Sequence, residues 1–114
     1  MATTPLQPIV FNKSLTTDWV TLYTVPETKK GAGIDAVVLN NYTMTSQSYS
    51  IRLVQTGTPG NLNEVISEVS IRAKDNNLAP AMIGQALVKG GIIQAKASAN
   101  DSININITAT IIDQ

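Results

Sequence analysis

Hydrophobic and polar residues alternate most regularly near the end of the chain. The hydrophobic residues occupy every second position: Ile103, Ile105, Ile107, Ala109 and Ile111. The residues between them are small and polar: Ser102, Asn104, Asn106, Thr108 and Thr110. Because successive side chains of a strand point to opposite faces, this pattern predicts a strand with one face in the core. The other face lacks the Lys and Glu of an ordinary solvated strand, so we expect it to be free to pack against another protein.

Shorter hydrophobic stretches, separated by turn residues, predict further strands at 9–11, 19–25, 34–39, 47–55, 65–72, 82–88 and 92–97. The segments 61–66 and 78–84 could each form a short helical turn instead. About eight short strands with turn signals at nearly regular spacing predict an all-β fold. We expect an antiparallel β-sandwich or jelly roll.

Alternation within the predicted strands also assigns faces. In 47–55 it places Tyr49, Ile51 and Leu53 inward, and in 65–72 it places Val65, Val69 and Ile71 inward. In 34–39 the same rule places Asp35 opposite to Ile34, Ala36 and Val38.

The first eight residues contain Pro5 and Pro8, which exclude a helix and favour an extended segment. We therefore predict an extended N-terminal arm at 1–8 and a single β-sandwich domain at 9–114. The arm is either a frayed terminus or a clasp on a neighbouring subunit.

The composition argues against several classes of function. Of the 114 residues, 43% are hydrophobic and only 14% are charged, and the formal net charge is +0. Nucleic-acid binding needs a basic excess or stripe, and membrane-surface binding needs a basic cluster, so we expect neither partner. No hydrophobic run approaches the roughly 20 residues of a membrane-spanning helix. Low charge and weak self-repulsion suit a subunit of an assembly.

The sequence offers no catalytic chemistry. The chain contains no His and no Cys, which removes the commonest general base, the commonest metal ligands and the usual nucleophile pairs. The carboxylates fall mostly in turns or on outward faces, and no pair stands out. We expect no enzyme activity, no metal and no cofactor.

Trp19 and Tyr23 are predicted to lie on the same face of their strand, two side-chain spacings apart. They could anchor the core or a subunit interface. With Tyr49 they could instead form an aromatic platform for sugars, as in carbohydrate-binding modules.

The segment Thr21-Leu22-Tyr23-Thr24-Val25-Pro26 resembles the "TLYTVP" opening of a group of small β-sandwich virion proteins of tailed bacteriophages. The turn Lys29-Lys30-Gly31 and the strand from Ile34 to Asn40 follow the same order of elements. Two later segments, Gly90 to Ala99 and Asp101 to Ile112, match the last strands of the group. Gly91 stands where the group usually has Asp, so a contact made by that Asp is not carried over.

The resemblance implies a structural protein of the virion, assembled in the host cytoplasm. The leading hypothesis is a capsid decoration (cement) protein, a homotrimer that binds the major capsid protein or other virion proteins. A tail, baseplate or fibre-attachment accessory protein is the alternative, and a carbohydrate-binding module is a further one. The candidate interface residues lie on the arm and on the outer face of the last strand: Pro5, Leu6, Pro8, Asn104, Asn106 and Thr108.

Overall fold

The computed structural model describes residues 3–113, with the side chains of residues 4–6 left out of the description. Within this range the chain forms nine strands and two short 3-10 helical turns. The strands are β1 (Thr3–Ser14), β2 (Val20–Thr24), β3 (Gly31–Asn41), β4 (Gln47–Val54), β5 (Glu64–Ile71), β6 (Asn76–Asn77), β7 (Ala86–Val88), β8 (Ile92–Ala97) and β9 (Ile103–Ile112). The turns are η1 (Asn61–Asn63) and η2 (Pro80–Met82). No helix in the described range is long and apolar enough to cross a bilayer.

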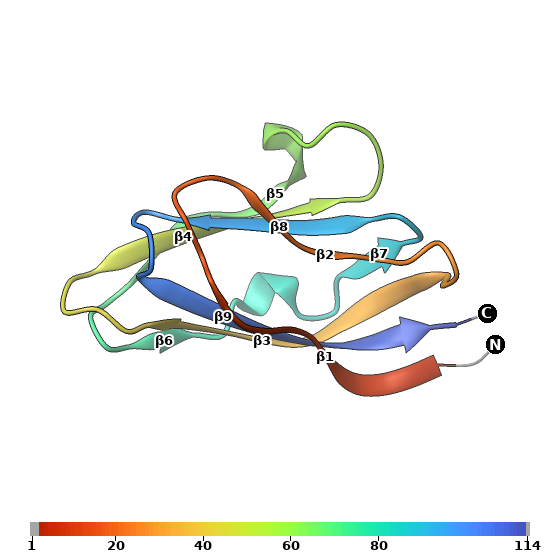
Figure 1. The fold of residues 1–114 in the computed structure, drawn as a ribbon, viewed down its shortest axis with the longest axis horizontal. Helices are drawn as coiled ribbons and strands as arrows, with labels where there is room; N and C mark the ends of the chain where they lie inside the picture. The colour runs from red at the N-terminus through yellow and green to blue at the C-terminus, as the bar shows by residue number, and fades with distance from the viewer. Residues whose placement is uncertain (1–2, 114) are drawn as a thin grey trace.

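The strands make two antiparallel sheets that face each other (Figure 1). One sheet has the order β1-β9-β3-β6, with β7 also paired to β3, and the other has the order β2-β8-β4-β5. The pairs are nested: β1 pairs with β9, β2 with β8, β3 with β6 and β7, and β4 with β5. A long hairpin rolled over into two layers gives this order, which is the topology of a jelly roll. The predicted all-β sandwich is confirmed.

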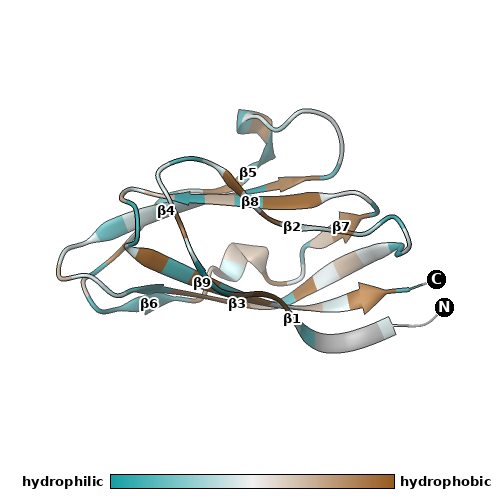
Figure 2. Ribbon diagram, viewed as in Figure 1, coloured by the Kyte–Doolittle hydropathy of each residue, from teal (hydrophilic) through white to brown (hydrophobic). Residues whose placement is uncertain are grey.

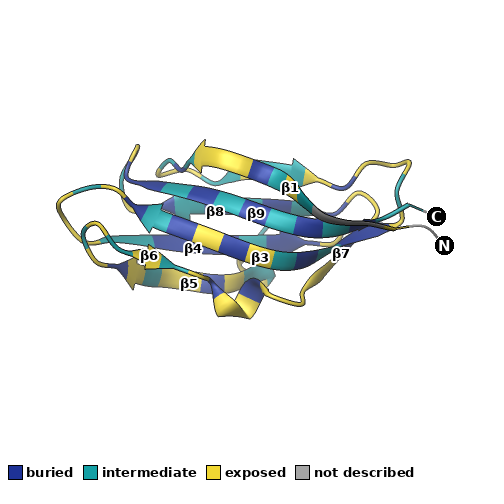
Figure 3. Cartoon of the chain, turned by 90° about the horizontal axis from the view of Figure 1, so that it is seen from below, coloured by how far each residue is buried: buried dark blue, intermediate teal, exposed yellow. Residues whose placement is uncertain are grey.

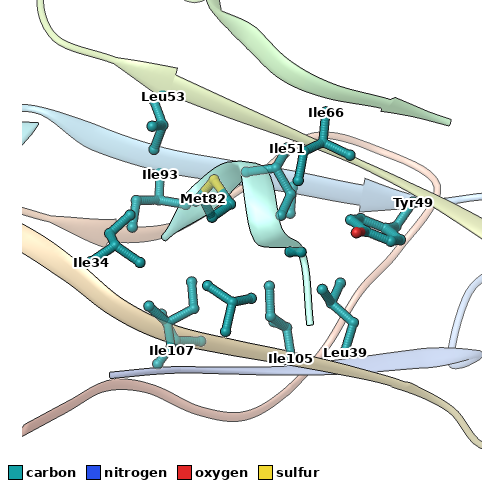
Figure 4. Close-up of a cluster of buried hydrophobic side chains, with 14 of the residues drawn as sticks. Ile34, Leu39, Tyr49, Ile51, Leu53, Ile66, Met82, Ile93, Ile105 and Ile107 are labelled. Atoms are coloured by element: carbon teal, nitrogen blue, oxygen red, sulfur yellow. The ribbon is translucent and has the colours of Figure 1, made fainter. Parts of the chain in front are cut away.

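Side chains of both sheets fill the space between the layers. Along β9, buried and half-buried residues alternate without exception, as the sequence predicted, and Figure 2 shows the corresponding bands of hydrophobic and hydrophilic residues. Figure 4 shows Ile105 and Ile107 pointing toward Ile51 and Ile93 of the other sheet. Met82 is fully buried and closes the space from the side, because η2 passes between the layers. The expected helical turns in 61–66 and 78–84 are η1 and η2.

Bulges correct two of the predicted faces. On β3 the pairing with β9 shifts between Ile34 and Ala36, so Ala36 and Val38 point outward and Val37 is buried. An extra residue in one strand moves every later side chain to the other face, which explains why simple alternation failed there.

On β5, Val65 is 36% exposed and Ile66 is 7% exposed, the reverse of the predicted assignment. The pairing with β4 shifts register here, and Glu68 adopts a left-handed φ of 48°. The inward positions of Tyr49, Ile51 and Leu53 on β4 are confirmed.

Residues 3–8, the described part of the predicted arm, form the first half of β1. Thr3, Thr4, Gln7 and Pro8 are paired with residues of β9 in the same chain. β1 lies at the edge of its sheet, where proline is tolerated because one row of backbone groups has no partner strand. Contact of this segment with a neighbouring subunit stays a prediction. Met1 and Ala2 lie outside the described residues.

Candidate interaction surface

The outer side of the β1-β9-β3 sheet gathers four of the predicted interface residues. On β9, Asn104, Asn106 and Thr108 are half-buried and point away from the core. Thr108 is flanked by Pro8 of β1 on one side and by Ala36 of β3 on the other. Val38 lies opposite Asn106 and is 39% exposed, and Asn40 lies opposite Asn104. We call this surface the uncharged face: Pro8, Ala36, Val38, Asn40, Asn104, Asn106 and Thr108.

The other two predicted residues, Pro5 and Leu6, lie on the same strand as Pro8. Their side chains are outside the description, so their part in the surface stays a prediction.

Intramolecular hydrogen bonds engage part of the polar side of β9. Asn106 Oδ1 accepts a hydrogen bond of 2.8 Å from the backbone N–H of Asn12. Thr110 Oγ1 donates to Asp35 Oδ2 at 2.7 Å, which occupies one oxygen of a carboxylate on β3 of the same sheet. Within the described part of the chain, Asn104 and Thr108 make no side-chain hydrogen bond, so their polar groups remain available to a partner.

Sequence reasoning missed Phe11 as a surface residue. Its side chain is 75% exposed, although Val10 beside it is 5% exposed. The pairing of β1 with β9 shifts between Val10 and Lys13, and Asn12 adopts a left-handed φ of 49°. Asn is among the few residues that tolerate this region, so Asn12 was the one local signal of a bulge.

The outer side of the β2-β8-β4-β5 sheet carries charged side chains. Two cationic side chains approach the Trp19 ring: the guanidinium carbon of Arg52 is 3.9 Å from the ring centroid and Lys96 Nζ is 5.0 Å from it. An open polar hollow of about 240 Å³ lies beside Lys96, with Glu68 also in its wall. The outer side of the β2-β8-β4-β5 sheet thus carries Arg52, Lys96 and Glu68, and the uncharged face presents amides, hydroxyls and apolar groups.

Trp19 and Tyr23 do not share a face. Pairing between β2 and β8 shifts between Thr21 and Tyr23, so Tyr23 lies opposite the buried Ile93 and packs against the core. Desolvation there raises the pKa of the Tyr23 hydroxyl, and the nearby Lys29 partly offsets the rise. The predicted shared face of Trp19 and Tyr23 is wrong, because a bulge turns Tyr23 toward the core. The alternative of an aromatic platform is therefore not formed by these rings, since Tyr49 is also buried.

Among residues 3–113, no three acidic side chains come close enough to hold a metal ion together.

The fold is similar to that of viral particle proteins. A chain in the crystal structure of the T13 infectious bursal disease virus particle aligns with 98% of this chain, with a TM-score of 0.59 and 8% sequence identity. A chain in the structure of the Gx strain of the same virus aligns with 98%, with a TM-score of 0.51 and 15% identity. At these identities the likeness shows the fold.

This chain spans about a third of the length of those proteins, 31% and 32% of them. No protein-family model matches the chain, and no curated protein sequence matches it.

Proposed function

We propose that this protein is a structural component of a virus particle, most specifically a decoration (cement) protein that binds the outside of a capsid. The observation that carries the proposal is the jelly-roll alignment with viral particle proteins over 98% of the chain. Jelly rolls recur in viral capsid and lectin domains, so the fold favours this class without deciding it. The resemblance of Thr21 to Pro26 to tailed-phage virion proteins supports the decoration role.

The uncharged face is the surface that we assign to the capsid. Interface cores are depleted of charge, and this face carries Asn104 and Thr108 with available polar groups beside the apolar Val38 and Pro8. A standard interface buries about 1,600 Å² in total. Repetition over a shell would multiply modest affinities, so a rigid subunit can strengthen a capsid without catalysis.

Quantitative mass spectrometry of purified particles of the virus that encodes this chain tests the proposal. A capsid decoration protein is expected in roughly hundreds of copies per particle, because its binding site is repeated over the subunits of the shell. A count near a dozen or fewer would contradict the decoration role and favour a tail or baseplate position. Absence of the chain from purified particles would overturn the virion role altogether.

Point substitutions then locate the binding surface. Val38→Glu and Thr108→Glu place a charge on the uncharged face and are expected to weaken binding to particles by about tenfold or more, since a desolvated charge opposes docking. Ser70→Glu is the matched control, because Ser70 is exposed on β5 of the other sheet. Equal loss with the control would contradict the assignment of this face. Removing residues 1–8 is a poor test, because residues 3–8 pair with β9.

A further inference from the structure

One edge of the sandwich carries a protruding aromatic side chain. Phe11 is 75% exposed on β1, and the bulge that turns it outward puts Asn12 in a left-handed conformation. Asn is among the residues that adopt this conformation readily, and the hydrogen bond from the Asn12 N–H to Asn106 Oδ1 stabilises it here. Aromatic side chains are frequent anchors of protein interfaces, which makes an exposed ring on an edge strand a candidate contact.

The opposite edge carries an apolar pocket of about 230 Å³ between β5 and η2. It is lined by Tyr49, Ile66, Val69, Asn77, Pro80 and Ala81. The Tyr49 hydroxyl donates a hydrogen bond of 2.7 Å to Asn77 Oδ1, which ties the two sheets together at this point. A cavity of about 150 Å³ accommodates benzene, so this pocket has room for one phenyl ring.

The two features lie where they can meet only between molecules. Figure 3 shows β1 along one edge of the molecule and β5 and β6 along the other. Leu78 and Ile83, which flank η2 in the sequence, are 60% and 46% exposed. A contact between unlike sites on two copies repeats head to tail and forms a ring where the rotation closes.

The two edge strands themselves carry charges of opposite sign. Within residues 3–14, β1 carries Lys13 as its one charged residue. β5 carries Glu64 and Glu68 and no cation. Attraction between the two strands would favour this pairing over contact between two identical edges.

We propose that Phe11 of one copy inserts into the β5–η2 pocket of a second copy, so that the protein self-associates head to tail. This contact does not rest on the proposed function, because it forms in the free protein and is measured without particles.

Sedimentation equilibrium of the full chain tests the proposal with two complementary variants. Phe11→Ala removes the phenyl group. Ala81→Lys blocks the pocket with a cation that also repels Lys13 of the second copy. Each variant alone is expected to weaken self-association by about 30-fold or more, as for loss of an anchor residue. An equimolar mixture of the two is expected to form a one-to-one heterodimer and nothing larger. The Phe11 side chain of the Ala81→Lys variant can insert into the intact pocket of the Phe11→Ala variant, and no second contact can form.

Met44→Ala is the matched control, since Met44 is 79% exposed elsewhere on the surface and its loss should leave the assembly intact. Circular dichroism verifies that each variant is folded, and Ala81→Gln replaces the Lys variant if that one unfolds. A monomeric wild-type protein at millimolar concentration would overturn the proposal. So would a dimer of Ala81→Lys alone, or a mixture that stays monomeric. Loss of particle binding with self-association unchanged would affect only the proposed function.

Discussion

Asn106 on the central strand β9 holds the backbone of Asn12 on the edge strand β1, through a hydrogen bond of 2.8 Å between Asn106 Oδ1 and the Asn12 N–H. The two residues are 94 positions apart in the chain. This bond stabilises the bulge at which Asn12 adopts a φ of 49°, and the bulge in turn sets the exposure of Phe11. One amide side chain therefore links the middle of the uncharged face to its edge.

Asn106→Ala is expected to lower the free energy of unfolding by about 1 kcal/mol, the net value of one hydrogen bond. Asn104→Ala is the control, because Asn104 is half-buried like Asn106 and makes no side-chain hydrogen bond within the described residues. Its effect should stay within about 0.5 kcal/mol. Urea unfolding measures both, and equal effects would show that the bond to Asn12 contributes nothing.

Asn41 is a fully buried amide at the end of β3. Its Nδ2 donates to the carbonyl oxygens of Thr45 and Ile71 at 2.8 and 2.9 Å, and its Oδ1 accepts from Thr43 N at 2.9 Å. Asn41→Ala would leave buried groups unpaired and should cost about 2–4 kcal/mol of stability. Asn40→Ala, one residue away on the outer face, should cost much less. Denaturant titration compares the two, and a loss below about 1 kcal/mol for Asn41→Ala would contradict this account.

Met82 is fully buried on η2, and Met44 is 79% exposed. Met82→Ala should destabilise the protein by about 2–5 kcal/mol, because it opens a cavity between the two sheets. Met44→Ala should change stability by no more than about 0.5 kcal/mol. Thermal unfolding compares the two variants, and similar melting temperatures would argue against the packing role of η2.

Gly31 and Gly33 differ in the space around them. A Cβ on Gly31 would overlap the carbonyl oxygen of Leu87 on β7, and a Cβ on Gly33 would meet nothing within 4 Å. Gly31→Ala should therefore destabilise the protein by about 1–3 kcal/mol through displacement of β7. Gly33→Ala should be neutral or stabilise it by up to about 1 kcal/mol. Chemical denaturation distinguishes them, and the reverse order would show that β7 does not pack closely on β3.

Tyr49 predicts a loss of stability in alkaline solution. Its side chain is 2% exposed, and burial raises its pKa to about 12 from the ordinary value of 10.0. Between these values the unfolded chain releases the proton more readily than the folded chain. The contribution of Tyr49 to the free energy of unfolding is therefore fully present below pH 10. It falls by on the order of 2 kcal/mol as the pH rises toward 12.

Urea unfolding as a function of pH measures this decline. Tyr49→Phe should flatten it, although the loss of the hydrogen bond to Asn77 lowers stability at neutral pH. An unchanged slope in the variant would assign the decline to other groups.

Much of the fold could be predicted from the sequence, because alternation in a strand is a local property. The five core positions of β9 and the inward residues of β4 were correct for that reason. β6 was not identified, and β7 is only the last part of the strand predicted at 82–88, because two or three residues give too short a pattern to set bounds. Predicted faces failed at Val65, Ala36 and Tyr23, each of which lies next to a bulge.

The candidate surface was predictable in part. Asn104, Asn106 and Thr108 could be assigned to an uncharged outer face from β9 alone. Phe11 could not, because the bulge that exposes it is stabilised by a residue distant in the sequence. The pocket between β5 and η2 also has no local signal, since its walls come from both sheets.

The sequence by itself determined the class of the fold, the polarity of its last strand and the scarcity of charge, because these follow from residue types and their spacing. Only the tertiary structure decided which strands pair, where bulges reverse a face, and how charge divides between the two outer surfaces. The physical reason is that strand pairing joins residues far apart in the chain. A one-residue shift in that pairing turns a side chain from the core to the solvent.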